Sequence, residues 1–192
     1  MKSLLTKLFS VMVLAGFVAA CGGDPNIESA KLNLNRGDYD QVISAAEAAL
    51  VTNPDNALGH YYRGIGLSEK GKALPVDQRE DSYTDAREAF DRAEQLFEEQ
   101  GRTSNEREFI PIQIIQIWGE EYNGAVSLIV PEEGEPTERG LQRSVHHLRN
   151  AIAIEPDSLQ ALDVLAEVYY MTGELQQAIS TMELAIEKTP EP

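Results

Sequence analysis

The stretch LQALDVLAEVYYMTGELQQAISTMELAIEKTP, residues 159–190, places small and large side chains at fixed intervals. With Leu159 as position 1, large residues fall at positions 4, 7, 11 and 24, and small ones at 8, 20 and 27. Position 15 is Gly173 and position 32 is Pro190. Small residues let two antiparallel helices approach closely, large residues fill the seam, glycine permits the turn and proline ends the second helix. The spacing therefore predicts two short helices joined by a tight turn.

The same intervals recur three more times along the chain. Small residues again take most of the close-contact positions, and glycine or proline takes most of the turns and helix ends. The matching residues, in chain order, are Gly37, Val42, Ala46, Ala49 and Pro54; Gly64, Leu67, Gly71, Tyr83, Ala86, Phe90 and Ala93; and Ile115, Trp118, Gly119, Tyr122, Ser144, Leu148, Ala151 and Pro156. Repetition at this interval predicts a stack of helical hairpins.

This pattern resembles the tetratricopeptide repeat, a unit of about 34 residues made of two antiparallel helices. The resemblance implies an all-α, right-handed superhelix of about four repeats. They lie at about residues 25–56, 57–100, 111–156 and 157–190, within one domain over residues 25–192. It also implies protein binding without catalysis. The match is strongest in the fourth repeat and weakest in the first, whose leading helix has Asn26, Ser29 and Asn33 where large residues are usual.

Two of the repeats are longer than the register allows. About ten extra residues, Lys72–Asp81, separate the helices of the second repeat, and residues 125–140, which contain proline and glycine, separate those of the third. Residues 125–130 could form a short strand or extend the preceding helix, and Pro111 is expected at the entrance of the third repeat. Equivalent turns lie along one edge of such a stack, so the two insertions are expected to be neighbours and to form a partner or ligand site.

The stretch GIGLSEKGKA, residues 64–73, comes within one residue of a phosphate-binding loop because it contains G-x-x-x-x-G-K. Such a loop needs a preceding strand, a following helix, and a serine or threonine after the lysine. The flanking residues here are typical of a helix, and Ala73 has no hydroxyl. The repeat register instead puts Gly64 at a close-contact position and Gly71 at a turn. We therefore expect no phosphate site.

The first 20 residues have the composition of a secretory signal. Lys2 and Lys7 precede an apolar run that ends in small residues and is too short to span a membrane permanently. Residues 18–21, VAAC, resemble the lipobox of bacterial lipoproteins. The resemblance implies removal of residues 1–20, acylation of Cys21 with palmitate among the acyl chains, and a lipidated tether over residues 21–24. Gly22 after the cysteine implies the periplasmic face of the outer membrane. An ordinary secreted protein with a stray cysteine is the alternative.

The charge of the chain argues against nucleic-acid binding. The formal net charge is −16, and removing residues 1–20 takes away two of the 16 basic residues, which leaves 14 − 32 = −18. Such a chain repels phosphate backbones, so neutral or basic partners are expected.

No pattern in the sequence predicts an enzyme. There is no G-x-S-x-G, H-E-x-x-H or Cys–His arrangement. His146 and His147 point to different faces of a helix and His60 falls at a packing position, so all three histidines are expected to be packed or solvated. We expect neither a cofactor nor a metal.

The family resemblance implies a binding groove lined by the first helix of each repeat. An acidic, amide-rich trough of this kind, with tyrosines at its side, suits the backbone or the basic side chains of an extended peptide. A groove that is only solvated is the alternative. The implied lining residues are Leu58, Tyr61, Ile65, Gln113, Gln116, Glu120, Gln160, Asp163, Glu167 and Tyr170.

The last repeat predicts a second surface, because no polar helix follows it before Pro192. Leu184 and its neighbours are expected to stay open to self-association or to a partner. The residues expected to pack inward are Leu175, Ile179, Met182, Ala185 and Ile186. The sequence thus predicts a membrane-anchored periplasmic scaffold that binds protein or peptide partners of an envelope assembly, of the pilus and secretin or outer-membrane assembly type. The alternative is a ligand-binding lipoprotein accessory to a solute transporter.

Overall fold

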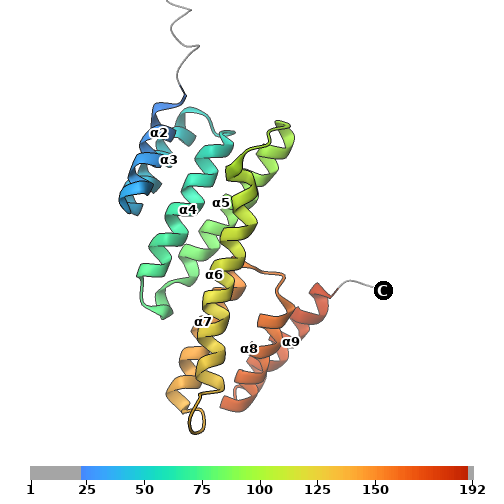
Figure 1. Ribbon diagram of the computed structural model, residues 1–192. Coiled ribbons are helices and arrows are strands. Elements are labelled where there is room, and N and C mark those ends of the chain that lie inside the picture. The colour runs from blue at the N-terminus through green and yellow to red at the C-terminus, as the bar shows by residue number, and fades with distance from the viewer. Residues whose placement is uncertain (1–22, 190–192) are drawn as a thin grey trace, which may run out of the picture.

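The computed structural model describes residues 23–189, which form eight α-helices and one 3-10 helix and contain no strand (Figure 1). The predicted signal segment and Cys21 lie outside the described residues. Within them, no helix is long and apolar enough to cross a membrane. The helices are α2 (Pro25–Arg36), α3 (Tyr39–Thr52), α4 (Ala57–Ala73), η1 (Val76–Gln78), α5 (Glu80–Glu99), α6 (Asn105–Ile129), α7 (Glu138–Ile154), α8 (Leu159–Thr172) and α9 (Leu175–Lys188).

Consecutive helices pair as α2–α3, α4–α5, α6–α7 and α8–α9, and this arrangement confirms the predicted all-α repeat of helical hairpins. The two shortest turns use glycine as predicted. Gly37 and Gly173 both end a helix in the left-handed conformation, with φ of 70° and 82°, and their N–H groups bond to carbonyls of the last turn. A residue with a Cβ is strained at such a φ, which is why glycine is favoured there.

Short polar side chains start most of the helices. Asn56, Ser104, Thr137 and Ser158 each accept a hydrogen bond from the backbone N–H three residues ahead, at 3.0–3.3 Å. These bonds satisfy donors that have no partner inside the helix. Asn56, Ser104 and Ser158 therefore mark where the second, third and fourth hairpins begin, independently of the apolar register.

The glycines of the phosphate-loop-like stretch lie inside one continuous helix, α4, as the repeat register requires. A Cβ on Gly64 would lie 2.6 Å from Cε1 of Phe90, so this glycine allows close contact between α4 and α5. The prediction that Gly71 forms a turn is wrong, because α4 continues to Ala73. Gly71 instead gives room to Tyr83, whose Cε1 lies 2.8 Å from where a Cβ would be.

Gly64→Ala is expected to destabilise the protein by about 1–3 kcal/mol, because the added methyl overlaps the fully buried Phe90 ring. Gly119→Ala is the matched control. Gly119 is also helical, but nothing lies within 4 Å of its Cβ position, so alanine there should stabilise α6 by about 0.5–1 kcal/mol. Urea unfolding followed by circular dichroism measures both changes. Equal effects of the two substitutions would contradict the close contact.

The extra residues of the long repeats mostly lengthen helices instead of forming loops. The first insertion leaves only residues 74–79 between α4 and α5, and the second leaves residues 130–137 between α6 and α7. Residues 125–129 extend α6, so of the two alternatives the helix is correct. The prediction that Pro111 begins the third repeat is wrong. The helix begins at Asn105, capped by Ser104, and Pro111 lies inside it on an exposed face.

The loop between α4 and α5, residues 74–79 (the first loop), and the loop between α6 and α7, residues 130–137 (the second loop), are not neighbours. Val76 and Arg79 of the first loop bond to Asn150 and Glu121, in the middle of the third hairpin. The second loop closes the far end of that hairpin, beginning nine residues beyond Glu121 along α6, or roughly 13 Å (Figure 1). The predicted joint site along one edge is therefore wrong. The physical reason is that the lengthened α6 carries its own loop past the turn of the second hairpin.

Helix α6 joins two hydrophobic cores. Ile110, Ile114 and Ile117 in its first half are buried with residues of α2–α5, whereas Ala125 in its second half is buried with α7 and α8. In Figure 1, α6 runs along α4 and α5 and continues past them into the C-terminal half. One helix of 25 residues therefore ties both halves of the array together.

The stack changes at the junction of the second and third hairpins. There α5 contacts α7 more extensively than it contacts α6. In a regular stack, positions 21 and 28 of the repeat register face the next hairpin. In α5 these positions are Arg87 and Glu94. Nη1 of Arg87 donates to the carbonyl of Ile154 at 3.1 Å and to Glu155 at 3.0 Å. Because Arg87 bonds to the end of α7, helix α7 packs on this part of α5, and α6 does not nest there as it would in a regular repeat.

Candidate functional site

In the second hairpin, the residues predicted to line the trough are covered by α6. Tyr61 and Ile65 are only 8% and 4% exposed and belong to the core, so their prediction as groove residues is wrong. Leu58 is half-buried and packs on the same core. The cause is α6, which begins before the expected position and lays Ile110, Ile114 and Ile117 into this core.

Burial also sets the chemistry of the two adjacent tyrosines on α4. The rings of Tyr61 and Tyr62 meet edge to face with centroids 5.0 Å apart. Burial, together with the charge of Glu106, raises the pKa of Tyr61 to about 12 and raises that of Tyr62 as well. Both hydroxyls therefore stay neutral at physiological pH. These tyrosines hold the core together and do not offer a binding surface.

On α6 the predicted lining is polar and largely bonded to itself. Gln116 and Glu120 are exposed, with Nε2 of Gln116 donating to Oε1 of Glu120 at 3.1 Å. Lys72 approaches Glu120 at 3.7 Å. Gln113 is half-buried, and its Oε1 accepts no hydrogen bond from the described part of the chain. This part of the trough shows no convergence of groups on a common ligand position.

A stacked aromatic pair, which the sequence did not reveal, joins α6 to α8. Trp118 and Tyr122 lie face to face with centroids 4.9 Å apart and planes 12° from parallel. The Trp118 indole donates to Oγ of Ser158 at 2.9 Å, and Gln160 donates to the Tyr122 hydroxyl at 3.0 Å. Gln160, predicted to line the trough, is thus occupied in holding two hairpins together.

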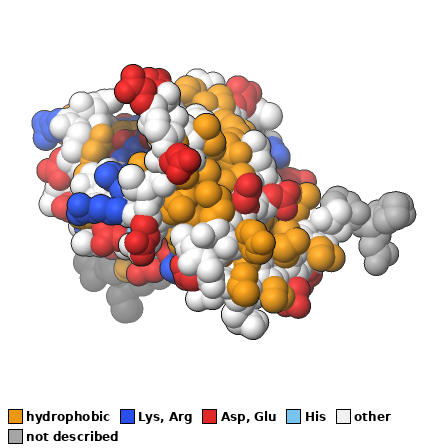
Figure 2. All heavy atoms as spheres, turned by 90° about the horizontal axis from the view of Figure 1, so that it is seen from below, with side chains coloured by type: hydrophobic (Ala, Val, Ile, Leu, Met, Phe, Trp, Pro, Cys, Tyr) orange, Lys and Arg blue, Asp and Glu red, His pale blue; other side chains and the backbone are white. Residues whose placement is uncertain are grey.

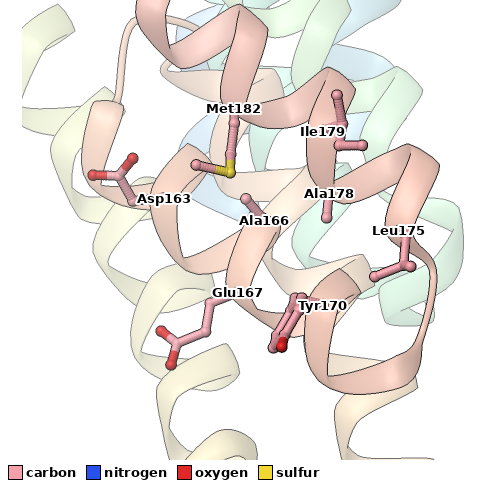
Figure 3. Close-up of a pocket in the computed structure, with 8 residues that line it drawn as sticks. All are labelled: Asp163, Ala166, Glu167, Tyr170, Leu175, Ala178, Ile179 and Met182. Carbon is pink, nitrogen blue, oxygen red and sulfur yellow. The ribbon is translucent and has the colours of Figure 1, made fainter.

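The remaining predicted residues, Asp163, Glu167 and Tyr170, line an apolar groove between α8 and α9 (Figure 3). The groove has a volume of about 560 Å³. Figure 3 shows Met182, Ile179 and Leu175 following one another along α9, and the two carboxylates lying along α8. Ala166 and Ala178 lie between the two helices. Asp163, Glu167 and Tyr170 are thus the predicted trough residues that line the apolar groove of the last hairpin in the described part of the chain.

The inward orientation predicted for α9 is largely wrong. Leu175, Ile179, Met182 and Ile186 are 51–71% exposed, and only Ala178 and Ala185 are buried. Short side chains at those two positions let α9 lie close to α8, so the bulky residues of the next face turn to solvent. Leu184, expected to be open, is 38% exposed. Figure 2 shows a broad band of hydrophobic side chains across the face seen from below, with acidic side chains beside it.

A buried carboxylate, Glu121, lies between the first loop and the third hairpin and is only 2% exposed. One oxygen accepts from Arg79 at 2.8 Å and from the Tyr83 hydroxyl at 3.1 Å, and the other contacts His147 at 2.7 Å and Asn150 at 3.3 Å. Burial raises the pKa of Glu121, but the bonds and charges of His147 and Arg79 together outweigh it, so the pKa lies below the ordinary 4.5.

Glu121 and its four partners, Arg79, Tyr83, His147 and Asn150 (the Glu121 cluster), hold the first loop against α6 and α7. Both carboxylate oxygens are saturated with protein donors, which leaves no room for a substrate atom. Among residues 23–189, no group of three His, Cys, Asp or Glu side chains is placed to hold a metal ion. One sequence signal was available: Glu121 continues the buried face of α6 formed by Ile110, Ile114 and Ile117.

Two of the three histidines have hydrogen-bond partners within the protein. His147 bonds to Glu121, and Nε2 of His60 lies 2.9 Å from the carbonyl of Pro54. Burial, aided by the nearby arginines, lowers the pKa of His60, so this ring is neutral at physiological pH. Their predicted packed or solvated state is consistent with these contacts.

Comparisons with known proteins assign no family to this chain. No family model matches the sequence, and no curated protein matches it. Among solved structures, one titled "Crystal structure of MamA" is similar over 83% of this chain and 93% of that one, at 14% sequence identity and a TM-score of 0.32. A likeness this weak supports no conclusion about function, which rests on the chain's own residues.

Proposed function

We propose that this protein is a non-catalytic scaffold that binds protein partners of a bacterial envelope assembly, of the pilus and secretin or outer-membrane assembly type. The observation that carries the proposal is the open apolar groove of the last hairpin, whose bulky residues are more than half exposed. Contiguous apolar surface of this kind on a soluble domain marks an interaction site. The resemblance of the repeat register to tetratricopeptide repeats supports the same class of function.

The proposed location is the periplasmic face of the outer membrane, through lipid on Cys21. The support is the lipobox-like sequence 18–21 and the glycine that follows it. Helix α2 starts at Pro25, so a tether over residues 21–24 would hold the first hairpin close to the membrane. The last hairpin lies at the opposite end of the array from α2 (Figure 1), which would leave its groove free for partners.

A small-molecule receptor accessory to a solute transporter is the second candidate. The groove volume of about 560 Å³ falls in the range that small ligands occupy. Small-ligand sites, however, enclose most of the ligand surface. In this groove Tyr170 is 70% exposed and the α9 residues remain open along their length, which favours a protein partner.

Site-specific photo-crosslinking in intact cells tests the scaffold function. The crosslinking residue is placed singly at Leu32, Ile112 and Ile179, which are similarly exposed on α2, α6 and α9. We expect at least one position to give a discrete crosslink to an envelope protein identified by mass spectrometry. Cys21→Ala should move the protein out of the membrane fraction and remove that crosslink. Absence of protein crosslinks from all three positions would refute the proposal.

A further inference from the structure

Two positions in the second helix of a hairpin form the contact surface for the next hairpin. In α3 these are Ile43 and Leu50, at positions 21 and 28 of the repeat register. A Cβ on Gly66 of α4 would lie 2.7 Å from Cγ1 of Ile43, and a Cβ on Gly59 would lie 2.8 Å from Cδ2 of Leu50. Gly59 and Gly66 are seven residues apart and therefore lie on one face of α4. An α-helix thus rests directly on this pair of positions.

The third hairpin repeats the arrangement. Val145 and Ile152 occupy the same two positions in α7, and both pack on the core that contains Leu165 and Val168 of α8. The second hairpin has Arg87 and Glu94 there instead, and this is the junction at which α6 does not nest on α5. Where the two positions are apolar, in α3 and α7, the first helix of the next hairpin packs on them. Where they are charged, in α5, the first helix of the next hairpin, α6, does not pack there in the regular way.

In the last hairpin the two positions are Ile179 and Ile186, which are 51% and 71% exposed. No helix within residues 23–189 covers them. Together with Leu175 and Met182 they form a stripe with spacings of four, three and four residues, about 16 Å long. The groove beside α8 continues this stripe. Ala166 and Ala178 line the groove, and their short side chains leave space in it. The surface has the shape that the earlier hairpins offer to a helix.

The charge around the stripe indicates what kind of helix fits. Of the described residues that line the groove, two are acidic, Asp163 and Glu167, and none is basic. Both are exposed, and no described side chain pairs with either of them. Helical spacing puts the exposed Glu183 on the other side of the stripe, away from α8. Carboxylates therefore flank the apolar stripe on both sides.

We propose that the groove of the last hairpin binds one amphipathic α-helix of a partner protein, whose apolar stripe has lysine or arginine on both flanks. The inference rests on the proposed scaffold function and specifies its site and partner chemistry. Basic flanks would meet Asp163, Glu167 and Glu183 and guide the helix into register. A second copy of this chain fits less well, because symmetric contact would bring the same carboxylates against each other.

Binding of synthetic peptides to the full lipidated chain in nanodiscs of zwitterionic lipid tests the inference. One peptide of about 18 residues has leucine at positions i, i+4, i+7 and i+11 with lysine on both flanks, and its twin has glutamate in place of the lysines. Fluorescence anisotropy, with empty nanodiscs as background, should give at least tenfold tighter binding of the lysine peptide. The preference should decrease as salt is raised.

Matched variants locate the binding. Ile179→Glu should weaken binding of the lysine peptide at least tenfold, whereas Ile112→Glu on α6, at a residue that is equally 51% exposed, should change it less than twofold. The pair Asp163→Lys with Glu167→Lys should reverse the preference to the glutamate peptide. The same change of charge at Asp85 and Glu88, both exposed on α5, should not reverse it.

Three results would overturn the inference: equal binding of the two peptides, equal loss with Ile112→Glu, or a dimer that Ile179→Glu dissociates in sedimentation velocity. The last would identify a second copy as the occupant. Failure of the inference can be told apart from failure of the proposed function. Partner crosslinks at Leu32 or Ile112 would preserve the scaffold function even if the groove binds no helix.

Discussion

Replacing Glu121 with alanine is expected to lower the free energy of unfolding by about 3–5 kcal/mol. The carboxylate is buried and carries four contacts, from Arg79, Tyr83, His147 and Asn150. Its removal leaves the Tyr83 hydroxyl and the His147 ring without their partner, and the Arg79 charge without its carboxylate, in a site that water reaches poorly. An uncompensated buried charge is costly. Urea unfolding of the variant and of the wild type, followed by circular dichroism, measures the difference.

The stability that the Glu121 carboxylate contributes should depend on pH, and this dependence shows that the ionised carboxylate is its source. The pKa of Glu121 lies below its ordinary value of 4.5 in the folded protein, so folding favours the ionised form. The stabilisation is therefore complete above the ordinary pKa and is lost as the pH falls through the lower, folded pKa. Glu121→Gln cannot ionise, so its deficit relative to the wild type should shrink below about pH 4.5. A deficit that is constant across this range would contradict the argument.

Phe90→Ala is the second large expected effect, with a loss of about 3–5 kcal/mol. The Phe90 ring is fully buried, and it lies against Gly64, which has no side chain that could expand into the space left by the ring. The cavity would remain largely unfilled because the two helix backbones fix its walls. The loss should appear in urea unfolding as a lower midpoint with little change in slope.

Phe109→Ala is the matched control for this substitution. Phe109 is 48% exposed on the outer face of α6, so the same change there removes little buried area and should cost less than about 1 kcal/mol. Similar losses at both positions would show that the seam between α4 and α5 is not the main source of stability.

The sequence predicted the local structure well wherever the register and the caps agree. Gly37, Gly173 and the small residues of the fourth repeat fixed two hairpins, and Gly64 was correctly assigned to a close helix contact. The phosphate-loop-like glycines were correctly placed within a helix. These features depend on contacts between neighbouring segments, which leave a short-range periodicity that can be read along the chain.

The candidate site was only partly predictable. Asp163, Glu167 and Tyr170 do line an open groove, whereas Tyr61 and Ile65 are covered by α6. Ile179 and Ile186 were expected to pack inward and are exposed instead. Register gives the face on which a residue lies, but burial depends on whether another helix arrives at that face.

By itself, the sequence determined that the chain forms α-hairpins and where most of them turn, because spacing, caps and glycines act within a few residues. The tertiary structure decided how the hairpins meet. Arg87 bonds α5 to the end of α7, the long α6 fills the predicted trough, and Glu121 bonds the loop between α4 and α5 to the third hairpin. These outcomes depend on contacts between residues tens of positions apart, and no local pattern specifies which apolar face will find a partner and which will stay open.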